Sequence, residues 1–119
     1  MTVPEKVLVE RLKKGDLEAF DMIYDMYASR LYAFSLKYLK SDDEAGELVQ
    51  SVFMKVWENH KKLDTNLSFK SFLFTIAYNE ICRLFRRKSY LKKYIEEAVR
   101  TDNRSDTSSE DNSEFHSLL

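Results

Sequence analysis

The chain has 119 residues, of which 44% are hydrophobic, and its formal net charge is −1. This length is enough for one compact domain, and a single proline and two glycines leave the interior without the regular turn residues of a β-rich domain. The lone Cys82 excludes an intrachain disulfide and suits a reducing cytosol, and no apolar run approaches the ~20 residues of a membrane span. Composition therefore predicts an all-α cytoplasmic protein without a membrane span. The helices predicted along the chain, about four in number, would form a compact bundle.

The first predicted helix covers about residues 4–14, and Gly15 is its predicted stop. Its buried face is predicted to consist of Val7, Leu8 and Leu12. Asp16 follows as an N-cap, because its carboxylate can accept hydrogen bonds from the free N–H groups of a new helix. The second helix is predicted from Leu17 to about Lys40, and its wide apolar stripe predicts a core helix with two neighbours. The stripe consists of Phe20, Ile23, Tyr24, Tyr27, Leu31, Phe34 and Tyr38.

Ser41 opens the third predicted helix, and Glu44 three residues later completes a capping box. Several acidic residues follow Ser41 in the first turns of this helix, where the helix dipole favours negative charge. The buried stripe is predicted to be Val49, Val52, Phe53, Val56 and Trp57. Residues 61–68 lack periodicity and are predicted to form a short loop. Ser68 is the preferred N-cap of the next helix, with Asn66 as the alternative.

The fourth predicted helix follows Ser68, continues at least to Arg87 and has helical propensity as far as Arg100. Its buried face is predicted to consist of Phe69, Phe72, Leu73 and Ile76. Its second part carries six positive charges between residues 83 and 93, with no acid among them. Aromatic residues followed by such a basic run are typical of a nucleic-acid-binding surface, since rings stack on bases and cations contact phosphates.

The character of the chain changes at Thr101. Residues 102–114 hold five acidic residues against one basic residue and almost no apolar side chain. This composition predicts a helical domain over residues 1–100 and a disordered, flexible acidic linker over residues 101–119. The last five residues resemble the start of a further segment, so we expect the chain to be a fragment of a longer protein.

The sequence contains no clear motif for a catalytic, metal-binding or cofactor-binding site. Two isolated glycines cannot form a phosphate-binding loop. His60 and His116 lack Cys, Asp or Glu partners at metal-ligand spacing, and Cys82 beside Ile81 suits a half-buried inert thiol. The acidic cluster at the start of the third helix is explained by capping. The sequence therefore predicts a protein that is not an enzyme and has no cofactor or metal.

Three stretches of the chain resemble the second conserved region of bacterial extracytoplasmic-function (ECF) sigma factors, small members of the sigma-70 family. The opening helical pair of that region is similar to LVERLKKGDLEAFDMIYDMYASRLYAFSLKYL (residues 8–39). Its most specific signature is similar to DDEAGELVQSVFMKVWENHKKL (residues 42–63). The helix that reads the −10 promoter element is similar to FKSFLFTIAYNEICRLFRRK (residues 69–88). The resemblance covers about residues 5–100 and implies a sigma region 2 helical domain.

Three positions depart from the family pattern. Gly46 replaces a usual acid, Phe72 a usual tryptophan and Arg83 a usual aspartate. The first departure bears on polymerase contact, the second on base wedging, and the third adds charge to the basic face. None of them breaks the pattern.

The resemblance implies that the third helix docks on the clamp coiled coil of the RNA polymerase β′ subunit. Glu47, Gln50 and Met54 lie at i, i+3 and i+7, on a strip away from the predicted buried stripe. They align with the clamp-contact positions of the family. Without the resemblance, an ordinary solvated helix face is the favoured interpretation of this strip.

In this family the loop between the third and fourth helices binds a flipped base of the non-template strand. Here that loop offers Asp64, Thr65, Asn66 and Ser68 to read a base edge, and it serves equally as a capping turn. The 17 residues from Lys70 to Arg87 would span about 25 Å along the promoter. Base or strand contacts are expected from Lys70, Phe72 and Asn79. Phosphate contacts are expected from Arg83, Arg86, Arg87 and Lys88, with a solvated basic face as the alternative.

The expected partners are the RNA polymerase core through its β′ clamp, promoter DNA and an anti-sigma factor. The acidic linker suits an electropositive polymerase channel that leads toward a region 4 domain, which we expect beyond residue 119. Two alternatives stay open. One is a helical protein-interaction module whose basic helix binds an acidic partner, and the other is a regulator that binds duplex DNA without polymerase.

Overall fold

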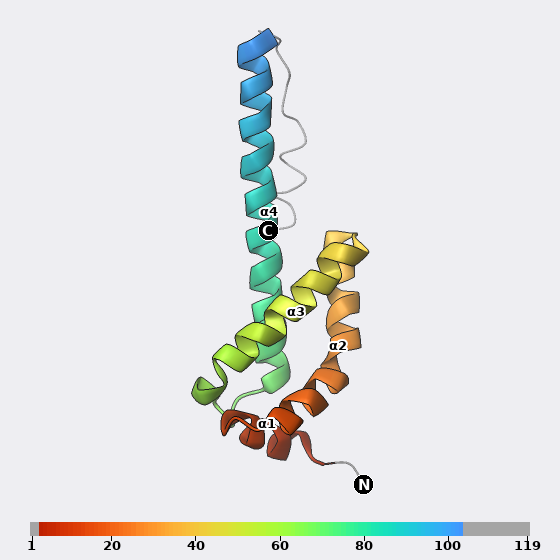
Figure 1. The fold of residues 1–119 in the computed structure, drawn as a ribbon, viewed down its shortest axis with the longest axis vertical. Helices are drawn as coiled ribbons and strands as arrows, with labels where there is room; N and C mark the ends of the chain where they lie inside the picture. The colour runs from red at the N-terminus through yellow and green to blue at the C-terminus, as the bar shows by residue number, and fades with distance from the viewer. Residues whose placement is uncertain (1–2, 104–119) are drawn as a thin grey trace. The chain divides into compact units, whose positions relative to one another are not determined.

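We describe residues 3–103 of the chain from a computed structural model (Figure 1). The helices are α1 (Glu5–Lys13), α2 (Leu17–Leu39), α3 (Asp42–Glu58) and α4 (Phe69–Asn103), with a 3-10 helix η1 (His60–Lys62) between α3 and α4. No strand occurs within residues 3–103, so the all-α prediction is confirmed for them. Within the same range, none of the helices combines the length and hydrophobicity that a membrane crossing requires.

The chain divides into two compact units, residues 1–79 and residues 80–119, and α4 contributes to both. The predicted acidic linker belongs to the second unit, where residues 104–119 fall outside the described part of the chain. The domain boundary predicted near residue 100 therefore stays a prediction, although α4 itself continues to Asn103.

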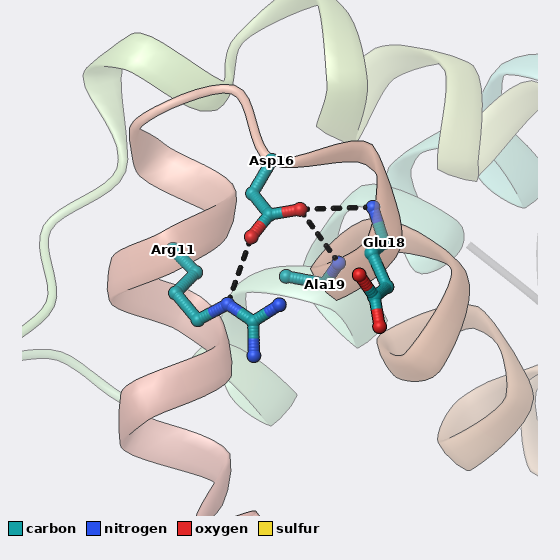
Figure 2. A network of polar contacts seen from close by, with 4 residues as sticks. All are labelled: Arg11, Asp16, Glu18 and Ala19. Atoms are coloured by element: carbon teal, nitrogen blue, oxygen red, sulfur yellow. Dashed lines mark hydrogen bonds and ion pairs between the residues drawn. The ribbon is translucent and has the colours of Figure 1, made fainter.

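The turn between α1 and α2 is built by Gly15 and Asp16, as the sequence predicts. Gly15 has a φ of +87°, a conformation that residues with a Cβ rarely adopt. Figure 2 shows that one Asp16 carboxylate oxygen accepts hydrogen bonds from the backbone N–H groups of Glu18 (3.0 Å) and Ala19 (3.3 Å). The other oxygen accepts a hydrogen bond from Arg11 Nε at 2.8 Å. This Arg11 hydrogen bond is the main cause that holds the pKa of Asp16 below its ordinary value.

The turn between α2 and α3 uses a lysine where glycine is more usual. Lys40 is the C-cap of α2 with a φ of 56°, in the left-handed region, and its N–H donates to the Leu36 carbonyl at 2.8 Å. The Ser41 hydroxyl then accepts a hydrogen bond from the Glu44 N–H at 3.3 Å, which confirms Ser41 as the N-cap of α3. After this tight turn, α3 runs back along α2 and packs against it (Figure 1).

The buried side of α2 is a line of residues spaced four apart. It consists of Ala19, Ile23, Tyr27, Leu31, Ser35 and Leu39. The buried Ser35 is satisfied, because its hydroxyl donates to the Leu31 carbonyl at 2.8 Å. The predicted stripe is partly wrong, since Phe20 and Tyr38 are half-buried and Tyr24 is exposed beside this line. α2 contacts α1 and α3, and its rings also pair with rings of α4, so it is a core helix with three neighbours instead of the predicted two.

Aliphatic side chains and one tyrosine hold α1 against α2. The buried residues of α1 are Leu8, Val9 and Leu12. Val7 was predicted in place of Val9 but is 42% exposed. The Tyr27 hydroxyl donates to the Glu5 carboxylate, and the Arg30 guanidinium lies 4.6 Å from the centre of the Tyr27 ring. Burial, followed by the hydrogen bond to Glu5, raises the pKa of Tyr27 to about 12.

α3 packs one apolar side against the rest of its unit. Its buried residues are Ala45, Leu48, Val49, Val52, Phe53 and Val56. Trp57, which was predicted in this stripe, is only half-buried. A Cβ at Gly46 would meet nothing within 4 Å, so no close packing in the described chain requires a glycine there.

α4 begins at the predicted N-cap, since the Ser68 hydroxyl accepts a hydrogen bond from the Ser71 N–H at 3.2 Å. Its first turns pack on α2 through ring pairs, with centroids 5.8 Å apart for Tyr27 and Phe69 and 5.2 Å apart for Phe34 and Phe74. The buried residues at every fourth position of α4 are Phe69, Leu73, Ala77, Ile81, Phe85 and Ser89. The predicted face was therefore partly misplaced, because Phe72 and Ile76 lie beside this line and are half-buried.

Candidate functional site

The loop of residues 63–68, between η1 and α4, is held by its own hydrogen bonds. The Asp64 carboxylate accepts a hydrogen bond from the Asn66 N–H at 2.9 Å, and the Asp64 carbonyl accepts one from the Leu67 N–H at 3.1 Å. Leu63 is buried and anchors the start of the loop. The loop is two residues shorter than predicted, because Lys61 and Lys62 belong to η1. A carboxylate has several lone-pair sites, so Asp64 keeps acceptor capacity for a further partner.

A cavity of about 210 Å³ lies beside this loop. Its lining residues are Val9, Lys62, Leu63, Asp64, Leu67, Ser68, Phe69 and Phe72. Of the predicted base-reading residues, Asp64, Ser68 and Phe72 reach this lining. The volume is below the ~300–1,000 Å³ of pockets for drug-sized ligands, so the cavity can hold only a small group. Apolar walls with a polar edge are what an unstacked nucleobase needs.

The remaining predicted base- or strand-contacting residues are not among those that line the cavity. Thr65 is half-buried, and Asn66, Lys70 and Asn79 are exposed. The remaining lining residues were not predicted as site residues from the sequence: Val9, Lys62, Leu63, Leu67 and Phe69. The signal for Leu67 was present, because it is an apolar residue in a polar loop, and it is 68% exposed.

A hollow of about 410 Å³ lies along α2 and α3. It is lined by Leu17, Phe20, Tyr24, Gln50, Phe53, Met54, Trp57 and Glu58. Its aromatic wall is continuous, with ring centroids 5.5 Å apart for Phe20 and Trp57 and 4.7 Å apart for Tyr24 and Phe53. Met54 is 64% and Leu17 61% exposed, so this hollow presents apolar side chains to solvent.

A second hollow of about 350 Å³ shares Tyr24 and Gln50 with the first. It is lined by Tyr24, Ala28, Ser29, Tyr32, Gly46, Val49 and Gln50. We call the two hollows together the α2/α3 groove. Of the three predicted clamp-contact residues, Gln50 and Met54 line this groove, and Glu47 is exposed but lines neither hollow. The contribution of α2 was missed, because its groove residues were assigned to the core stripe or to no role.

Tyr32 lines the second hollow of the groove. Its hydroxyl donates to the Asp42 carboxylate at 2.7 Å, which joins α2 to the start of α3. This hydrogen bond is the main cause that raises the pKa of Tyr32 above its ordinary value. The phenol therefore stays neutral and keeps its proton as a donor to Asp42.

The imidazole of His60 stacks on Trp57, with ring centroids 4.5 Å apart and an interplanar angle of 23°. Its Nδ1 lies within hydrogen-bond distance of the Trp57 carbonyl, one of the last carbonyls of α3, so His60 contributes a contact at the C-terminus of that helix. Within residues 3–103, no group of three or more His, Cys, Asp or Glu residues is arranged to hold a metal ion. Cys82 is buried.

The basic segment, residues 83–93, lies on the part of α4 that belongs to the second unit. Arg83, Arg86 and Arg87 are exposed, and Lys88 is half-buried. Arg83 Nη1 forms an ion pair with Glu80 Oε1 at 2.7 Å, one turn earlier on the same helix. This pair was not predicted from the sequence, although the i, i+3 spacing could have indicated it. Part of the charge of Arg83 is thus already compensated.

Comparisons with known proteins identify the family. The sequence model of the Sigma-70 region 2 family matches residues 23–90, more than half of the chain. The ECF RNA polymerase sigma factor SigW of Bacillus subtilis (strain 168) is 31% identical over 83 residues, which are 70% of this chain and 44% of SigW. The ECF RNA polymerase sigma-E factor of Escherichia coli (strain K12) is 31% identical over 75 residues, 63% of this chain and 39% of that factor. The chain thus spans less than half the length of these relatives.

A solved structure agrees with these sequence matches. It is an NMR structure of an engineered region 2 of sigmaE in complex with GTAAAA, with a TM-score of 0.63 and 28% sequence identity. The match covers 85% of this chain and 97% of that chain. The family model thus matches most of α2, all of α3 and much of α4, and the solved structure has the same helical fold. The chain belongs to the sigma-70 family, as a region 2 domain of the ECF sigma factor type.

Proposed function

We propose that this domain acts in transcription initiation by binding the clamp of RNA polymerase and by recognising and melting the −10 promoter element through its non-template strand. The observation that carries the proposal is the cavity beside residues 63–68, with its apolar walls and polar edge. A base cannot enter such a cavity while it is stacked in a duplex. A domain that holds an unstacked base binds the opened strand better than the duplex, and this difference favours melting. The role is one of binding and not of enzymatic turnover.

The cavity offers a different interaction on each side. Phe72 supplies a ring for stacking, Asp64 supplies acceptors and Ser68 supplies a hydroxyl for a base edge. Stacking of one base on an aromatic side chain is worth roughly 1–3 kcal/mol. The exposed amide of Asn66, in the same loop, carries both donors and an acceptor, so we expect it to discriminate between bases.

The basic segment supplies affinity that does not depend on sequence. Each arginine that neutralises a phosphate releases counterions, so this contribution is strong at low salt and weak at high salt. Arg83, Arg86, Arg87 and Lys88 are expected to supply these contacts, and Glu80 already compensates part of the charge of Arg83. Lys70 and Asn79 are expected to guide the strand along the first part of α4.

The α2/α3 groove is the proposed contact with the polymerase β′ clamp. An apolar groove with an aromatic wall suits the apolar face of a helix. Gln50 at the junction of the two hollows would fix the register, Met54 would adapt its shape to the partner, and Glu47 would contact the polar rim. An anti-sigma factor that covered the same groove would compete with polymerase. This role places the protein in the cytoplasm.

The direct test measures binding of labelled single strands by fluorescence anisotropy, with and without RNA polymerase core. GTAAAA is the first probe because the similar region 2 structure holds it, and each base is then varied in turn. We expect a preference among the single strands, weaker binding to the matching duplex, and a higher affinity once polymerase is present.

The outcomes separate the proposed function from the alternatives. Absence of both base preference and polymerase association would reject it. Equal or tighter binding to the duplex without polymerase would indicate a duplex-binding regulator instead. Association with proteins but with no nucleic acid would indicate a protein-interaction module.

The clamp contact has a test of its own with a matched control. Met54 and Met26 are both exposed methionines, but only Met54 lines the groove. Met54→Ser should lower the affinity for polymerase core at least about fivefold, as expected for an anchor residue in an interface. Met26→Ser should leave that affinity unchanged. Equal effects of the two substitutions would place the clamp contact elsewhere.

A further inference from the structure

His60 lies where α3, η1 and the turn between α1 and α2 come together. It is the first residue of η1, two positions after the end of α3. Its side chain is half-buried, and it is not among the residues that line the cavity beside the loop of residues 63–68. Neither the proposed base contacts nor the proposed clamp contacts include this residue.

The last turn of α3 holds the His60 ring in two ways. The imidazole stacks on the Trp57 ring, with centroids 4.5 Å apart and an interplanar angle of 23°. The imidazole Nδ1 also lies within hydrogen-bond distance of the Trp57 carbonyl. Because a carbonyl oxygen only accepts, Nδ1 carries the proton and donates it to this bond. A stack and a hydrogen bond to the same residue together fix the orientation of the ring.

The turn between α1 and α2 lies beside the same ring. A Cβ built on Gly15 would lie 3.4 Å from His60 Nε2, which is van der Waals distance. The helix α1 also contacts η1 directly. The position of the His60 ring is therefore tied both to the end of α3 and to the turn that follows α1.

The backbone of His60 connects these contacts to the cavity. The His60 carbonyl accepts a hydrogen bond from the Leu63 N–H at 3.2 Å. Lys62 and the buried Leu63 both line the cavity, and α1 supplies Val9 to the same lining. The position of His60 thus affects where the η1 side of the cavity lies relative to the α1 side.

η1 has little stability of its own. It is a 3-10 helix of three residues, and none of them is buried. Hydrogen bonds of 3-10 helices have poorer geometry than those of α-helices, so such a short turn depends on contacts with its surroundings. The stack of His60 on Trp57 is a contact of this kind.

We propose that His60 is a positioning residue for base recognition, which holds η1 and the start of the loop of residues 63–68 in place through its stack on Trp57. This inference rests on the proposed recognition of a base by the cavity. A hydrogen bond weakens steeply when its geometry is wrong, so a displaced loop would distinguish bases poorly. The basic segment would still bind phosphates of any sequence. The loss of His60 should therefore reduce selectivity among bases more than affinity for nucleic acid in general.

Binding of single strands that differ at one base tests the role of the ring. His60→Ala should lower the ratio between the best and the other bases about threefold to tenfold, as for one lost hydrogen bond. It should leave the salt dependence of binding unchanged, because the basic segment is intact. His60→Phe keeps a ring on Trp57 and should hold the ratio within about twofold of the native value. An unchanged ratio in His60→Ala, or an equal loss in both variants, would overturn the proposal.

Tyr38→Ala is the matched control for a loss of stability. Tyr38 is half-buried like His60, and its ring pairs with that of Phe34 on α2, with centroids 5.2 Å apart. Both alanine variants should lower the free energy of unfolding measured in urea, but only His60→Ala should change the base ratio of the folded protein. A similar fall of the ratio in Tyr38→Ala would overturn the positioning role. If His60→Ala does not fold, His60→Asn takes its place with the same expected loss, because asparagine keeps an N–H donor without a ring.

Amide hydrogen exchange tests the positioning without nucleic acid. The Leu63 N–H donates to the His60 carbonyl, and the Ala45 N–H donates to the Ser41 carbonyl at 2.9 Å at the start of α3. His60→Ala should accelerate exchange at Leu63 at least about fivefold more than at Ala45, which reports the change in general stability. Equal changes at the two amides would overturn the proposal. If the native chain shows no base preference while Leu63 responds as expected, the proposed base recognition fails and the placement of η1 by His60 stands.

Discussion

The two ends of α4 have similar amino-acid patterns, but the apolar residues of one end are buried and those of the other are exposed. From Phe69 to Ser89, every fourth residue is buried, and the first turns pack on α2 through aromatic rings. From Tyr90 to Val99, apolar residues recur with the same helical spacing, and all of the large ones are at least 40% exposed. Helical periodicity is thus equally good at both ends, but burial is confined to one of them.

This difference in burial gives the two ends of α4 different roles. The buried end fixes the position of Phe72 and Ser68 beside the cavity, because a helix anchored at Phe69 and Leu73 cannot slide. The exposed end presents charge and apolar surface to partners. Substitutions in the buried end should therefore lower the free energy of unfolding, and substitutions in the exposed end should mainly change the affinity for partners.

The largest difference is expected for Leu73→Ala and Leu91→Ala. Leu73 is fully buried, so its truncation should lower the free energy of unfolding by about 2–5 kcal/mol. Leu91 is 58% exposed, and its truncation should cost no more than about 0.5 kcal/mol. Urea denaturation of both variants measures the two values. A large loss for Leu91→Ala would mean that the second end is also packed.

Enlarging an alanine gives the reverse test. Ala77 is fully buried, and Ala77→Leu should destabilise the fold by about 1–3 kcal/mol through overpacking. Ala98 is exposed, and Ala98→Leu should leave the free energy of unfolding nearly unchanged, since both residues favour helix. Thermal unfolding followed by circular dichroism compares them. Similar melting temperatures for the two variants would contradict the difference in burial.

Charge reversal separates the basic segment from the rest of the exposed end. Arg86→Glu should weaken binding to every single strand roughly tenfold at low salt and should make the salt dependence less steep. Arg100→Glu makes the same charge change outside the basic segment and should have a smaller effect. Anisotropy titrations at several salt concentrations measure both. An equal loss would mean that α4 attracts DNA only through its total charge.

The smallest change in the free energy of unfolding is expected at Glu80 and Arg83, between the two ends of α4. Glu80→Gln removes the ion pair with Arg83, whose side chain is 52% exposed, so the free energy of unfolding should change by less than about 1 kcal/mol. The released Arg83 should raise DNA affinity by a few-fold. Arg83→Gln in the same background should abolish that gain. A gain that persists would locate the effect outside Arg83.

Local chemistry made the helix starts predictable from the sequence. Asp16, Ser41 and Ser68 were each predicted as N-caps, and each accepts a hydrogen bond from an N–H two or three residues later. The stop at Gly15 was predictable for the same reason, because its positive φ favours glycine. Capping depends on neighbours in the chain, so a short window of sequence contains the necessary information.

Features that depend on distant neighbours were predicted less well. The apolar stripe of α2 included Tyr24 and omitted the buried Ser35, because the sequence does not say which side faces α1 and α3. Lys40 occupies a left-handed C-cap without the usual glycine. For the candidate site, Asp64 and Ser68 were predicted in the loop, but Leu67 was not. The cavity also needs Val9 from α1, which lies more than 50 positions away from the loop.

The central claim is a division of roles between the loop of residues 63–68 and the basic segment of α4. It is tested most directly by measuring the affinities of Asn66→Ala and Arg86→Glu for single strands that differ at one base, with RNA polymerase present. Asn59→Ala serves as a control for an exposed asparagine outside the loop of residues 63–68. We predict that Asn66→Ala lowers the ratio between the best and the other bases about threefold to tenfold, as for one lost hydrogen bond. Arg86→Glu should weaken all strands by one common factor and keep the ratio. If both variants changed the ratio equally, or if neither changed it, the division of roles would be contradicted.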